Sequence, residues 1–372
     1  MKKVVLFTLA LCLIAGFAGA AETIKIGLMA PLTGDWTSEG QEMNQFVGLL
    51  VEQLNGKGGL LGKQVELIAE DDGGDPKTAA LAAQRLSTQK IVAVIGTYGS
   101  SVTEASQNIY DESKILQIAN GSTAIRLSEK KLKYFFRTCP RDDEQGRVAA
   151  QTIEKMGVKK VAILHDNTTY SKGLADEAKA LLEGKGVAIG FYDALTPKES
   201  DYTTILTKLK AAGPDLVFFT GYYPEAGTLL KQKKEMGWQT PFVGGDATQN
   251  PDLVKIAGKD AAKGFYFISP PMPQDLPSEK AKSILAAYKE KYKGAPGSIY
   301  AVLAGDGFLV LTAAIEATKS TDPDKLADYL HKEFKDFSGL TGKIAFNEKG
   351  DRVGEVYRVY TVDAEGNFVL QP

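Results

Sequence analysis

Apolar and polar positions in the first third of the chain alternate between strand and helix patterns. Residues 23–30 (TIKIGLMA) alternate and then run apolar, which predicts a strand. The next segment predicts a helix ending at Asn55–Gly56, because its apolar residues recur on one helical face: Met43, Phe46, Val47, Leu50, Val51 and Leu54. Pro76 opens a second helix, and further strands are predicted at residues 64–71, 91–96 and 115–120. This order predicts a parallel sheet covered by helices.

The pattern breaks at residues 134–146 (YFFRTCPRDDEQG) and then starts again. The second set of strands, with helices between them, is predicted at residues 159–166, 187–195, 214–221 and 241–246. A Pro-rich connector leads to three predicted helices, around Ile284–Tyr292, Tyr300–Ala317 and Asp324–Phe334, and the C-terminal segment is rich in strand and turn patterns. A chain of 372 residues also exceeds what one hydrophobic core usually supports. We therefore predict an α/β protein of two doubly wound lobes joined by several crossings.

The N-terminus has the pattern of a secretory signal peptide. Two lysines precede an apolar run that ends AGA at Ala20, so we expect residues 1–20 to be removed by cleavage after Ala20 or Ala21. Cys12 follows a leucine rather than a small residue, which argues against a lipid anchor. We expect no later segment to be long and apolar enough to span a membrane. The rest of the chain is expected to be exported and soluble.

Composition excludes several classes of function. Charged residues make up 24% of the chain and the net charge is −2, which gives no case for binding nucleic acid or an anionic membrane. Cys139 is the one cysteine after the signal peptide, and His165 and His331 are the only histidines, so a cysteine- or histidine-rich metal site is excluded. Residues 56–64 lack the spacing of a phosphate loop, and no G-x-S-x-G motif occurs. We therefore expect no catalytic residues, no metal and no cofactor.

Polar and aromatic residues gather at the predicted carboxyl ends of the strands, where open α/β sheets bind ligands. In the first lobe these ends carry Tyr98–Ser101 and Asn120–Thr123, and in the second they carry Asp166–Tyr170, Gly221–Tyr223 and Gly244–Asp246. Hydroxyls and free backbone N–H groups at helix N-termini suit a carboxylate. Aromatic rings with one acid suit a cation beside an apolar group. A zwitterion with an apolar side chain would satisfy both lobes.

Each of these residues also has a simpler interpretation. Ser100, Ser101 and Thr123 could be helix N-caps, which is the commonest role of such residues. Asp246 could cap a short helix near Pro251. The remaining candidates could be packing residues: Tyr170, Tyr222, Trp36 and His165. The combination over several strand ends favours the binding interpretation.

Several segments together resemble the leucine/isoleucine/valine-binding proteins, which are periplasmic receptors of ABC amino-acid transporters with the type I periplasmic binding protein fold. The resemblance runs over nearly the whole chain after the signal peptide. The segments that carry it are residues 24–40, 54–79, 94–106, 163–175, 218–227, 241–246 and 337–352. Their order and spacing are specific, although no single segment is decisive.

The resemblance implies a role for individual residues. Ser100 and Thr123 match residues that hydrogen-bond the α-carboxylate and amine of the ligand, and Gly121 matches one that offers a backbone carbonyl. Asp246 matches the acid that pairs with the α-ammonium, which is a glutamate in the family. The aromatic positions match rings that close over the ligand or line its side-chain pocket: Tyr170, Tyr222 and Tyr300.

The sequence departs from the family pattern in two places. The positions of a disulfide found near the pocket in many members are glycines here, Gly74 and Gly99. Glu39 stands where the family has an aromatic against the ligand side chain, and Tyr98 replaces an aliphatic residue. Two arrangements are open. Glu39 turns outward to solvent or a backbone amide, with Trp36 supplying an apolar wall, or Glu39 and Tyr98 together bind a polar ligand.

The sequence thus predicts a periplasmic, non-enzymatic receptor that delivers an amino acid, foremost leucine, isoleucine or valine, to an inner-membrane ABC permease. A receptor for a polar amino acid or other small carboxylate or amide, and an exported hydrolase, are the alternatives. We expect a monomer with a three-crossing hinge near Cys139–Pro140, Ser269–Pro270 and Leu340–Thr341. The expected lobes are residues 21–139 with 271–340, and residues 141–269 with 341–372, with the ligand between them.

Overall fold

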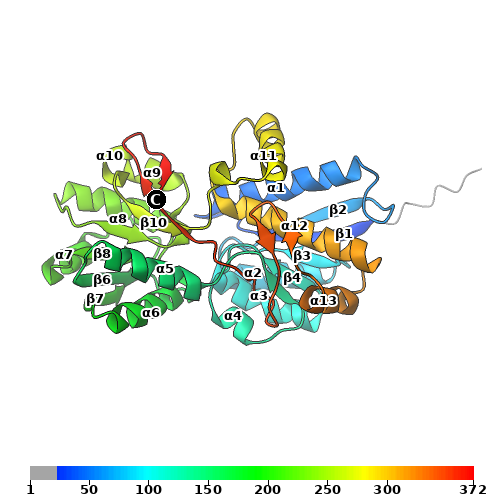
Figure 1. The fold of residues 1–372 in the computed structure, drawn as a ribbon, viewed down its shortest axis with the longest axis horizontal. Helices are drawn as coiled ribbons and strands as arrows, with labels where there is room; N and C mark the ends of the chain where they lie inside the picture. Colours follow the sequence, from blue (N-terminus) through cyan, green and yellow to red (C-terminus); the bar gives the residue numbers. More distant parts are fainter. Residues whose placement is uncertain (1–22) are drawn as a thin grey trace, which may run out of the picture.

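The computed structural model describes residues 23–372, so the expected signal peptide and Cys12 lie outside the described residues. Figure 1 shows two α/β lobes side by side along the long axis of the molecule, with several chain segments passing between them. Each lobe is built around its own sheet, one of five strands and one of seven. The fold class expected from the sequence is confirmed.

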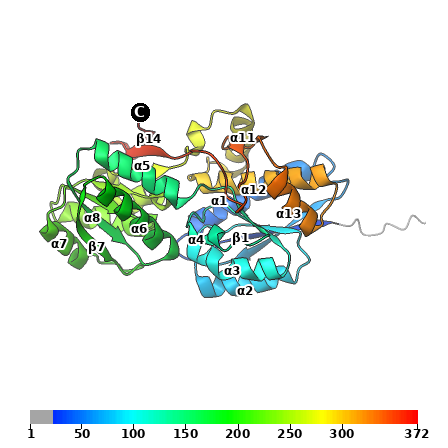
Figure 2. The ribbon, with the colours of Figure 1, turned by 60° about the horizontal axis from the view of Figure 1, so that its bottom comes forward.

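The first lobe contains a wholly parallel sheet in the order β2-β1-β3-β4-β5. Its strands are β1 Ile24–Ala30, β2 Val65–Asp71, β3 Ala93–Ile95, β4 Leu116–Ala119 and β5 Phe135–Arg137. Its helices are α1 Thr37–Asn55, α2 Pro76–Ser87, α3 Ser100–Glu112, α4 Arg126–Glu129, α11 Glu279–Tyr292, α12 Ile299–Thr318 and α13 Pro323–Lys332. Figure 2 shows α2 and α3 on one side of β1, with α11, α12 and α13 on the other.

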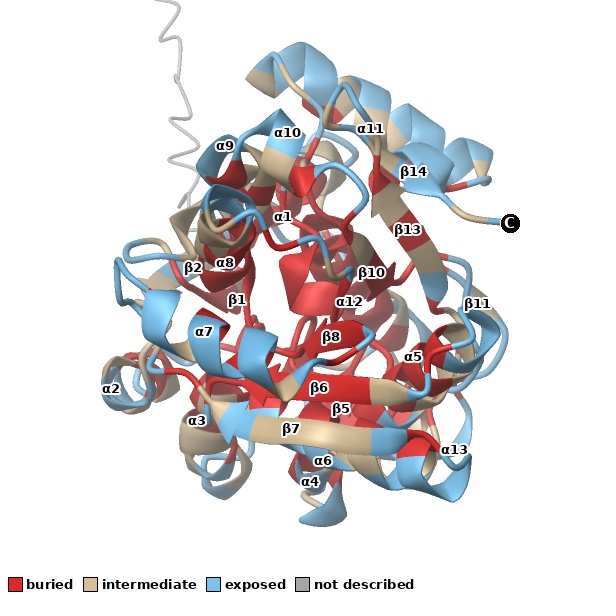
Figure 3. Cartoon of the chain, turned by 90° about the vertical axis from the view of Figure 1, so that its left-hand side faces the viewer, coloured by how far each residue is buried: buried red, intermediate tan, exposed pale blue. Residues whose placement is uncertain are grey.

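The second lobe contains a sheet in the order β14-β13-β10-β9-β8-β6-β7. Its strands are β6 Lys160–His165, β7 Ala188–Ala194, β8 Leu216–Phe219, β9 Phe242–Gly244, β10 Tyr266–Ser269, β13 Arg358–Val362 and β14 Phe368–Leu370. Its helices are α5 Asp142–Lys155, α6 Thr169–Gly184, α7 Thr203–Ala212, α8 Tyr223–Glu235, α9 Asp252–Ala257 and α10 Lys259–Ala262. At one edge of this otherwise parallel sheet, β13 runs antiparallel to β10, and β14 runs antiparallel to β13. Figure 3 shows β6 and β8 buried and the edge strand β7 only partly covered.

Local sequence explains where the main helices of the first lobe begin and what they bury. The predicted apolar face of α1 is buried at Met43, Phe46 and Val47, which have no exposed surface. Helix α2 begins as predicted at Pro76, because Asp75 caps it by accepting hydrogen bonds from two backbone N–H groups. Both helices contact β1, whose residues are buried except for the half-buried Lys25.

Helix α12 contradicts one expectation from the sequence. By length and composition, Ile299–Thr318 is apolar enough to cross a membrane, and the sequence analysis had expected no such segment. The helix packs against α1 and the first sheet, and 83% of its 18-residue apolar stretch is buried inside the protein. A helix that is apolar on all sides is typical of the core of a large domain. Within the part of the chain that the structure describes, α12 is a buried core helix of the first lobe.

The segment that broke the sequence pattern contains a strand. Residues 135–137 form β5, the edge strand of the first sheet, and its last residue, Arg137, is fully buried. The guanidinium of Arg137 donates to Asp351 Oδ1 at 2.6 Å, to the carbonyls of Ser122 and Ala124 at 2.9 Å, and to the hydroxyl of Ser128 at 2.8 Å. Burial of this charge is stable because its donors are paired.

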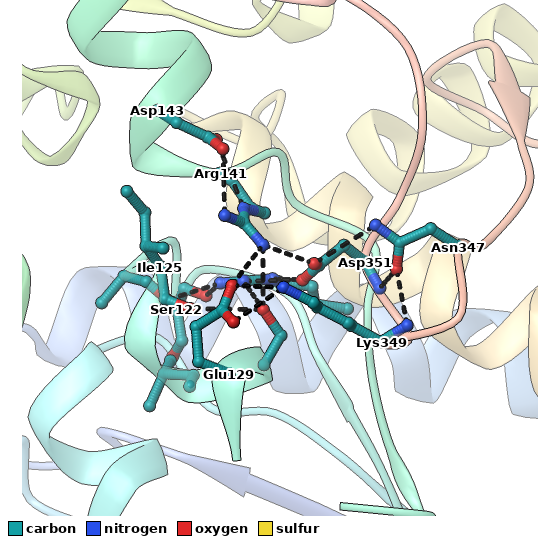
Figure 4. A network of polar contacts seen from close by, with 12 residues as sticks. Ser122, Ile125, Glu129, Arg141, Asp143, Asn347, Lys349 and Asp351 are labelled. Atoms are coloured by element: carbon teal, nitrogen blue, oxygen red, sulfur yellow. Dashed lines mark hydrogen bonds and ion pairs between the residues drawn. The ribbon is translucent and has the colours of Figure 1, made fainter. Parts of the chain in front are cut away.

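The third crossing lies later in the chain than expected. Residues 341–352 were expected in the second lobe, but Asp351 pairs with Arg137 beside β5, and the Arg137 amide donates to the Gly350 carbonyl at 3.0 Å. Gly350 has φ +78°, and a Cβ there would lie 2.1 Å from the Phe135 carbonyl oxygen, so the close approach requires glycine. Figure 4 shows Arg141 and Asn347 reaching the carboxylate of Asp351 in the same network. The chain therefore returns to the second lobe after Arg352.

Candidate binding site

The nine residues predicted to contact a ligand are all buried in the structure. They come from both lobes: Glu39, Tyr98, Ser100, Gly121, Thr123 and Tyr300 from the first, and Tyr170, Tyr222 and Asp246 from the second. Their rings meet directly, since the centroids of Tyr98 and Tyr222 lie 5.7 Å apart across the two lobes. The carboxyl ends of the strands of the two sheets thus contribute to one interior.

Five aromatic rings form a continuous wall in this interior. Tyr98 packs edge-on against Tyr300 at 4.9 Å, and Tyr170 contacts Tyr222 at 5.4 Å. The indole of Trp36 stacks on Tyr222 at 4.2 Å and meets Tyr98 at 5.3 Å. The Tyr98 hydroxyl is buried and makes no hydrogen bond with the described residues. The ring faces make this wall largely apolar, and the Tyr98 hydroxyl is a buried polar group within it that has no partner among residues 23–372.

Trp36 occupies the space beside the two glycines where the resemblance implied a missing disulfide. A Cβ on Gly74 would lie 2.7 Å from the indole, and a Cβ on Gly99 would lie 2.8 Å from it. Gly74 also has φ +65°. Both positions are glycine because the ring leaves no room for a side chain. Trp36 thus lines the interior. This is the position expected for it in the arrangement where Trp36 supplies an apolar wall.

The corner between β3, β4 and α3 carries the hydroxyl groups of the first lobe. Gly99 is the N-cap of α3 and no side chain caps this helix, so Ser100 and Ser101 are not N-caps. Ser100 Oγ accepts from the Ala124 amide at 3.2 Å, and Ser101 Oγ accepts from the amide of Thr169 in the second lobe at 3.0 Å. The Thr123 hydroxyl is buried without a regular hydrogen bond to any described residue. Arg137 fixes this loop by binding the carbonyls on both sides of Thr123.

Asp246 supplies a buried carboxylate on the side of the second lobe. It follows β9 and does not cap α9, whose N-cap is Pro251. Its Oδ2 accepts from the Tyr357 hydroxyl at 2.9 Å, while Oδ1 has no regular hydrogen bond within residues 23–372. Burial raises the pKa of Asp246 to about 6, and nearby tyrosine hydroxyls partly offset that rise. The acid is therefore largely ionised at neutral pH, and one of its oxygens has no regular hydrogen bond.

Three residues that the sequence analysis did not single out complete this side of the site. Gln145 donates to the Tyr357 hydroxyl at 2.9 Å and to Asp142 Oδ1 at 3.3 Å, and accepts from the Tyr170 hydroxyl at 3.2 Å. Burial, and then the nearby Asp246 carboxylate, raise the pKa of Asp142 well above its ordinary value. Asp142 and Gln145 follow the first crossing and Tyr357 follows the third, so they lie far apart in sequence.

Glu39 does not adopt the outward arrangement that was one of the two expected from the sequence, and its contact with a ligand stays a prediction. It is fully buried rather than turned to solvent, and its partners are side chains rather than a backbone amide. Asn250 Nδ2, from the second lobe, donates to Glu39 Oε1 at 2.7 Å, and the Ser298 hydroxyl lies 2.5 Å from Oε2. Burial raises the pKa of Glu39 to about 8, with a further contribution from Glu42. At neutral pH the side chain is therefore a neutral acid that joins the two lobes.

Other hydrogen bonds between the lobes flank the buried interior. The Tyr223 hydroxyl at the start of α8 donates to the Asp35 carbonyl at 2.7 Å and lies 3.0 Å from the Ser38 hydroxyl. On the other side, Thr169 receives a hydrogen bond from Arg126 at 2.7 Å and donates to Glu104 at 2.8 Å. The lobes are in contact on both sides of the site, which excludes bulk water from it.

No group of three or more His, Cys, Asp or Glu side chains among residues 23–372 could hold a metal ion. The Nδ1 atom of His165 accepts from the Asn167 amide at 3.2 Å, and the imidazole packs against Tyr192. His165 is thus engaged within the second lobe and packs as the sequence suggested.

Comparison with known proteins places these observations in a family. A family model described as "Periplasmic binding protein" matches residues 23–367. The "Leucine-, isoleucine-, valine-, threonine-, and alanine-binding protein" of Pseudomonas aeruginosa is 34% identical, covering 93% of this chain and 92% of its own. The "Leu/Ile/Val-binding protein homolog 1" of Brucella abortus is 32% identical over the full length of both chains.

Solved structures give the same picture. A leucine binding protein, LivK, from Thermotoga maritima superposes with a TM-score of 0.87 at 28% identity, covering 94% of this chain and 98% of its own. A branched-chain amino acid transporter substrate binding protein, LivJ, from Streptococcus pneumoniae in complex with isoleucine superposes with a TM-score of 0.86 at 29% identity, covering 94% and 99%.

Proposed function

The chain belongs to the periplasmic binding protein family, and on this basis we propose that it is the receptor of an ABC transporter for a branched-chain amino acid. In this role it binds leucine, isoleucine or valine in the periplasm and delivers the amino acid to an inner-membrane permease without chemical change. Relatives named for these amino acids, among them one solved with isoleucine, support the proposal. Residues 1–20 would direct export as a signal peptide and would then be removed.

One observation carries the proposed chemistry. The interior that holds the wall of aromatic rings also holds two buried polar atoms without regular partners, the Thr123 hydroxyl and Asp246 Oδ1. An amino acid would place its carboxylate at Ser100 and Thr123, with the Gly121 carbonyl accepting from its amine, and its ammonium at Asp246. The aliphatic side chain would lie against Tyr98, Tyr222, Tyr300 and Trp36. Each charge of the zwitterion would then be paired as the lobes exclude water.

The environment of Glu39 favours an aliphatic ligand over a charged or amide-bearing one. Both carboxyl oxygens already have a partner inside the protein, Asn250 and Ser298, so Glu39 is held by the protein rather than presented to a polar side chain. The buried Tyr98 hydroxyl still lacks a partner. That group favours a small hydroxyl amino acid, such as threonine, as a second candidate.

We propose that the lobes close over the ligand by a hinge. The boundaries that fit the contacts are residues 23–139 with 271–352, and residues 141–269 with 357–372. Arg137, Arg141 and Asp351 would lie at the pivot, where strong ion pairs keep the crossings in place. Closing would create the contacts of Tyr223 and Thr169 between the lobes.

The experiment is calorimetry on protein that has been unfolded and refolded to remove any co-purifying ligand. Leucine, isoleucine, valine, threonine and glutamine are titrated in turn, and mass spectrometry identifies what the untreated protein carries. Tight binding of the three branched-chain amino acids, with threonine weaker, is expected. Tight binding of glutamine with no heat from leucine would overturn the choice of ligand, and turnover of a bound amino acid would overturn the receptor function.

A further inference from the structure

Gln145 lies at the centre of the hydrogen bonds that hold Asp246. It sits on the first turn of α5, directly after the chain enters the second lobe, and is fully buried. Its amide contacts four groups at once: the Asp246 backbone amide, and the side chains of Tyr170, Tyr357 and Asp142. Neither its sequence position nor a recognisable motif points to this role.

The orientation of the Gln145 amide follows from what each neighbour can donate or accept. The backbone N–H of Asp246 can only donate, so the atom 2.9 Å from it must be Oε1. Nε2 then faces the Tyr357 oxygen at 2.9 Å and must donate to it. Because the Tyr357 oxygen accepts from the amide, its own proton is free to reach Asp246 Oδ2, which lies 2.9 Å away. The Asp246 backbone N–H thus orients the Gln145 amide, and this amide orients the Tyr357 hydroxyl. The Tyr357 hydroxyl in turn donates to the Asp246 carboxylate.

This chain of donors engages only one of the two carboxylate oxygens of Asp246. Oδ2 is committed to Tyr357, and Oδ1 has no regular hydrogen bond from the described residues. The side-chain amide of Gln145 is closely packed. A Cβ on Gly245 would lie 2.3 Å from the Tyr170 hydroxyl and 2.8 Å from Gln145 Oε1, so the backbone can approach the amide here only as glycine.

We propose that Gln145 is a positioning residue for the ligand ammonium: it holds both the backbone and, through Tyr357, the carboxylate of Asp246, so that Oδ1 points at the cation. The proposal rests on the proposed function, in which Asp246 pairs with an α-ammonium. Gln145 acts through Asp246 and Tyr357 rather than by contact with the ligand. The ligand class that depends on it is therefore a primary ammonium adjacent to a carboxylate.

The test is Gln145→Met, which keeps the length of the side chain but removes every hydrogen bond. Two probes are used, leucine and its analogue without the amino group, 4-methylpentanoate, whose binding is measured by competition. We expect the preference for leucine over 4-methylpentanoate to fall at least about tenfold, the loss of one well-placed polar interaction. Affinity for 4-methylpentanoate should be little changed, because that probe makes no use of Asp246.

Gln107→Met is the matched control. Gln107 is a buried glutamine of the first lobe that donates to the Leu127 carbonyl at 3.1 Å, so its loss should leave the preference unchanged. Tyr357→Phe, which keeps the ring, should reduce the preference as Gln145→Met does, and the double variant should add little because the two residues act in series. Tyr357→Phe alone also tests the proposal if Gln145→Met does not fold.

The outcomes separate the two proposals. If Gln145→Met and Tyr357→Phe weaken both probes by the same factor, Gln145 has only a structural role and the positioning proposal is wrong. If Asp246→Asn leaves the preference for leucine unchanged, Asp246 does not carry the ammonium and the proposed function fails at this residue. A preference reduced in all three variants, with the control unchanged, supports both.

Discussion

Asp246→Asn tests the electrostatic basis of the proposed function. The substitution removes the charge of a buried acid but keeps its shape and an oxygen that can still accept from Tyr357. Because burial raises the pKa of Asp246 only to about 6, the carboxyl carries its charge at pH 7.5. Removing one partner of a desolvated charge pair typically costs about 2–5 kcal/mol, which corresponds to roughly 30-fold to several thousand-fold in affinity. We expect leucine affinity to fall within that range.

The same carboxylate predicts a dependence of affinity on pH. A bound ammonium favours the ionised acid, so the pKa of Asp246 is lower in the complex than the value of about 6 without ligand. Binding is therefore close to full strength well above pH 6 and weakens as the pH falls through 6, because the acid must first lose a proton. From this pKa we expect about tenfold weaker binding at pH 5 than at pH 7.5 in the unaltered protein.

Calorimetry at both pH values, on refolded protein, measures the two effects together. In Asp246→Asn this part of the pH dependence should disappear along with most of the affinity. Glu225→Gln is the control, since Glu225 is a buried acid of the same lobe with a pKa raised to about 7 by burial, and it binds the Lys198 amide. Unchanged affinity in Asp246→Asn, or an unaltered loss of binding at pH 5, would refute the reasoning.

The remaining predictions concern Glu39, the hydroxyl corner and the hinge. Burial raises the pKa of Glu39 from 4.5 to about 8, so the folded protein holds a proton that the unfolded chain releases above about pH 4.5. The free energy of unfolding therefore falls as the pH rises from 5 to 8, and it levels off above pH 8. Glu39→Gln mimics the neutral acid, and thermal unfolding should show a midpoint at least about 2–4 °C higher than wild type at pH 8 but not at pH 5; equal midpoints at both pH values would contradict the buried neutral acid. Leucinamide should bind far more weakly than leucine if Ser100 and Thr123 hold the carboxylate, whereas equal calorimetric affinities would remove that role. Small-angle scattering should show a smaller radius of gyration with leucine than without, and binding without compaction would contradict hinge closure.

Much of the fold could be predicted because its signals are local. Met43, Phe46 and Val47 recur at helical spacing and are buried together, and Asp75 with Pro76 marks a helix start within two residues. The strand β5 was missed because it has only three residues and ends in an arginine, which is normally a surface residue. Arg137 can be buried only because Asp351 reaches it from far along the chain. Because this pair holds Asp351 beside β5, the third crossing lies after Arg352 and not at Leu340–Thr341, where the sequence predicted it.

The candidate site divides in the same way. Seven of the nine candidates lie at strand ends and could be named from the sequence, since the topology of an open sheet brings such ends together. Glu39 and Tyr300 lie on helices and were named only from the family resemblance. The structure buries all nine, and their contact with a ligand stays a prediction. Gln145 and Tyr357 could not be named, because their partners lie in segments distant in sequence. Glu39 was seen as unusual, but its partner Asn250 belongs to the other lobe, and no local pattern pairs the two.

The indole of Trp36, lying over Gly74 and Gly99, links three positions in their evolution. A cysteine at either glycine would meet the ring at less than 3 Å, so a relative with a disulfide at these positions cannot also hold a tryptophan in this place. Conversely, a lineage that loses the ring gains space for side chains at both glycines, although Gly74 would still carry the strain of a positive φ. The three sites are therefore expected to change as a set, with intermediates that carry one new residue alone selected against. A covalent brace and a stacked aromatic ring are two mutually exclusive ways to stiffen this edge of the pocket.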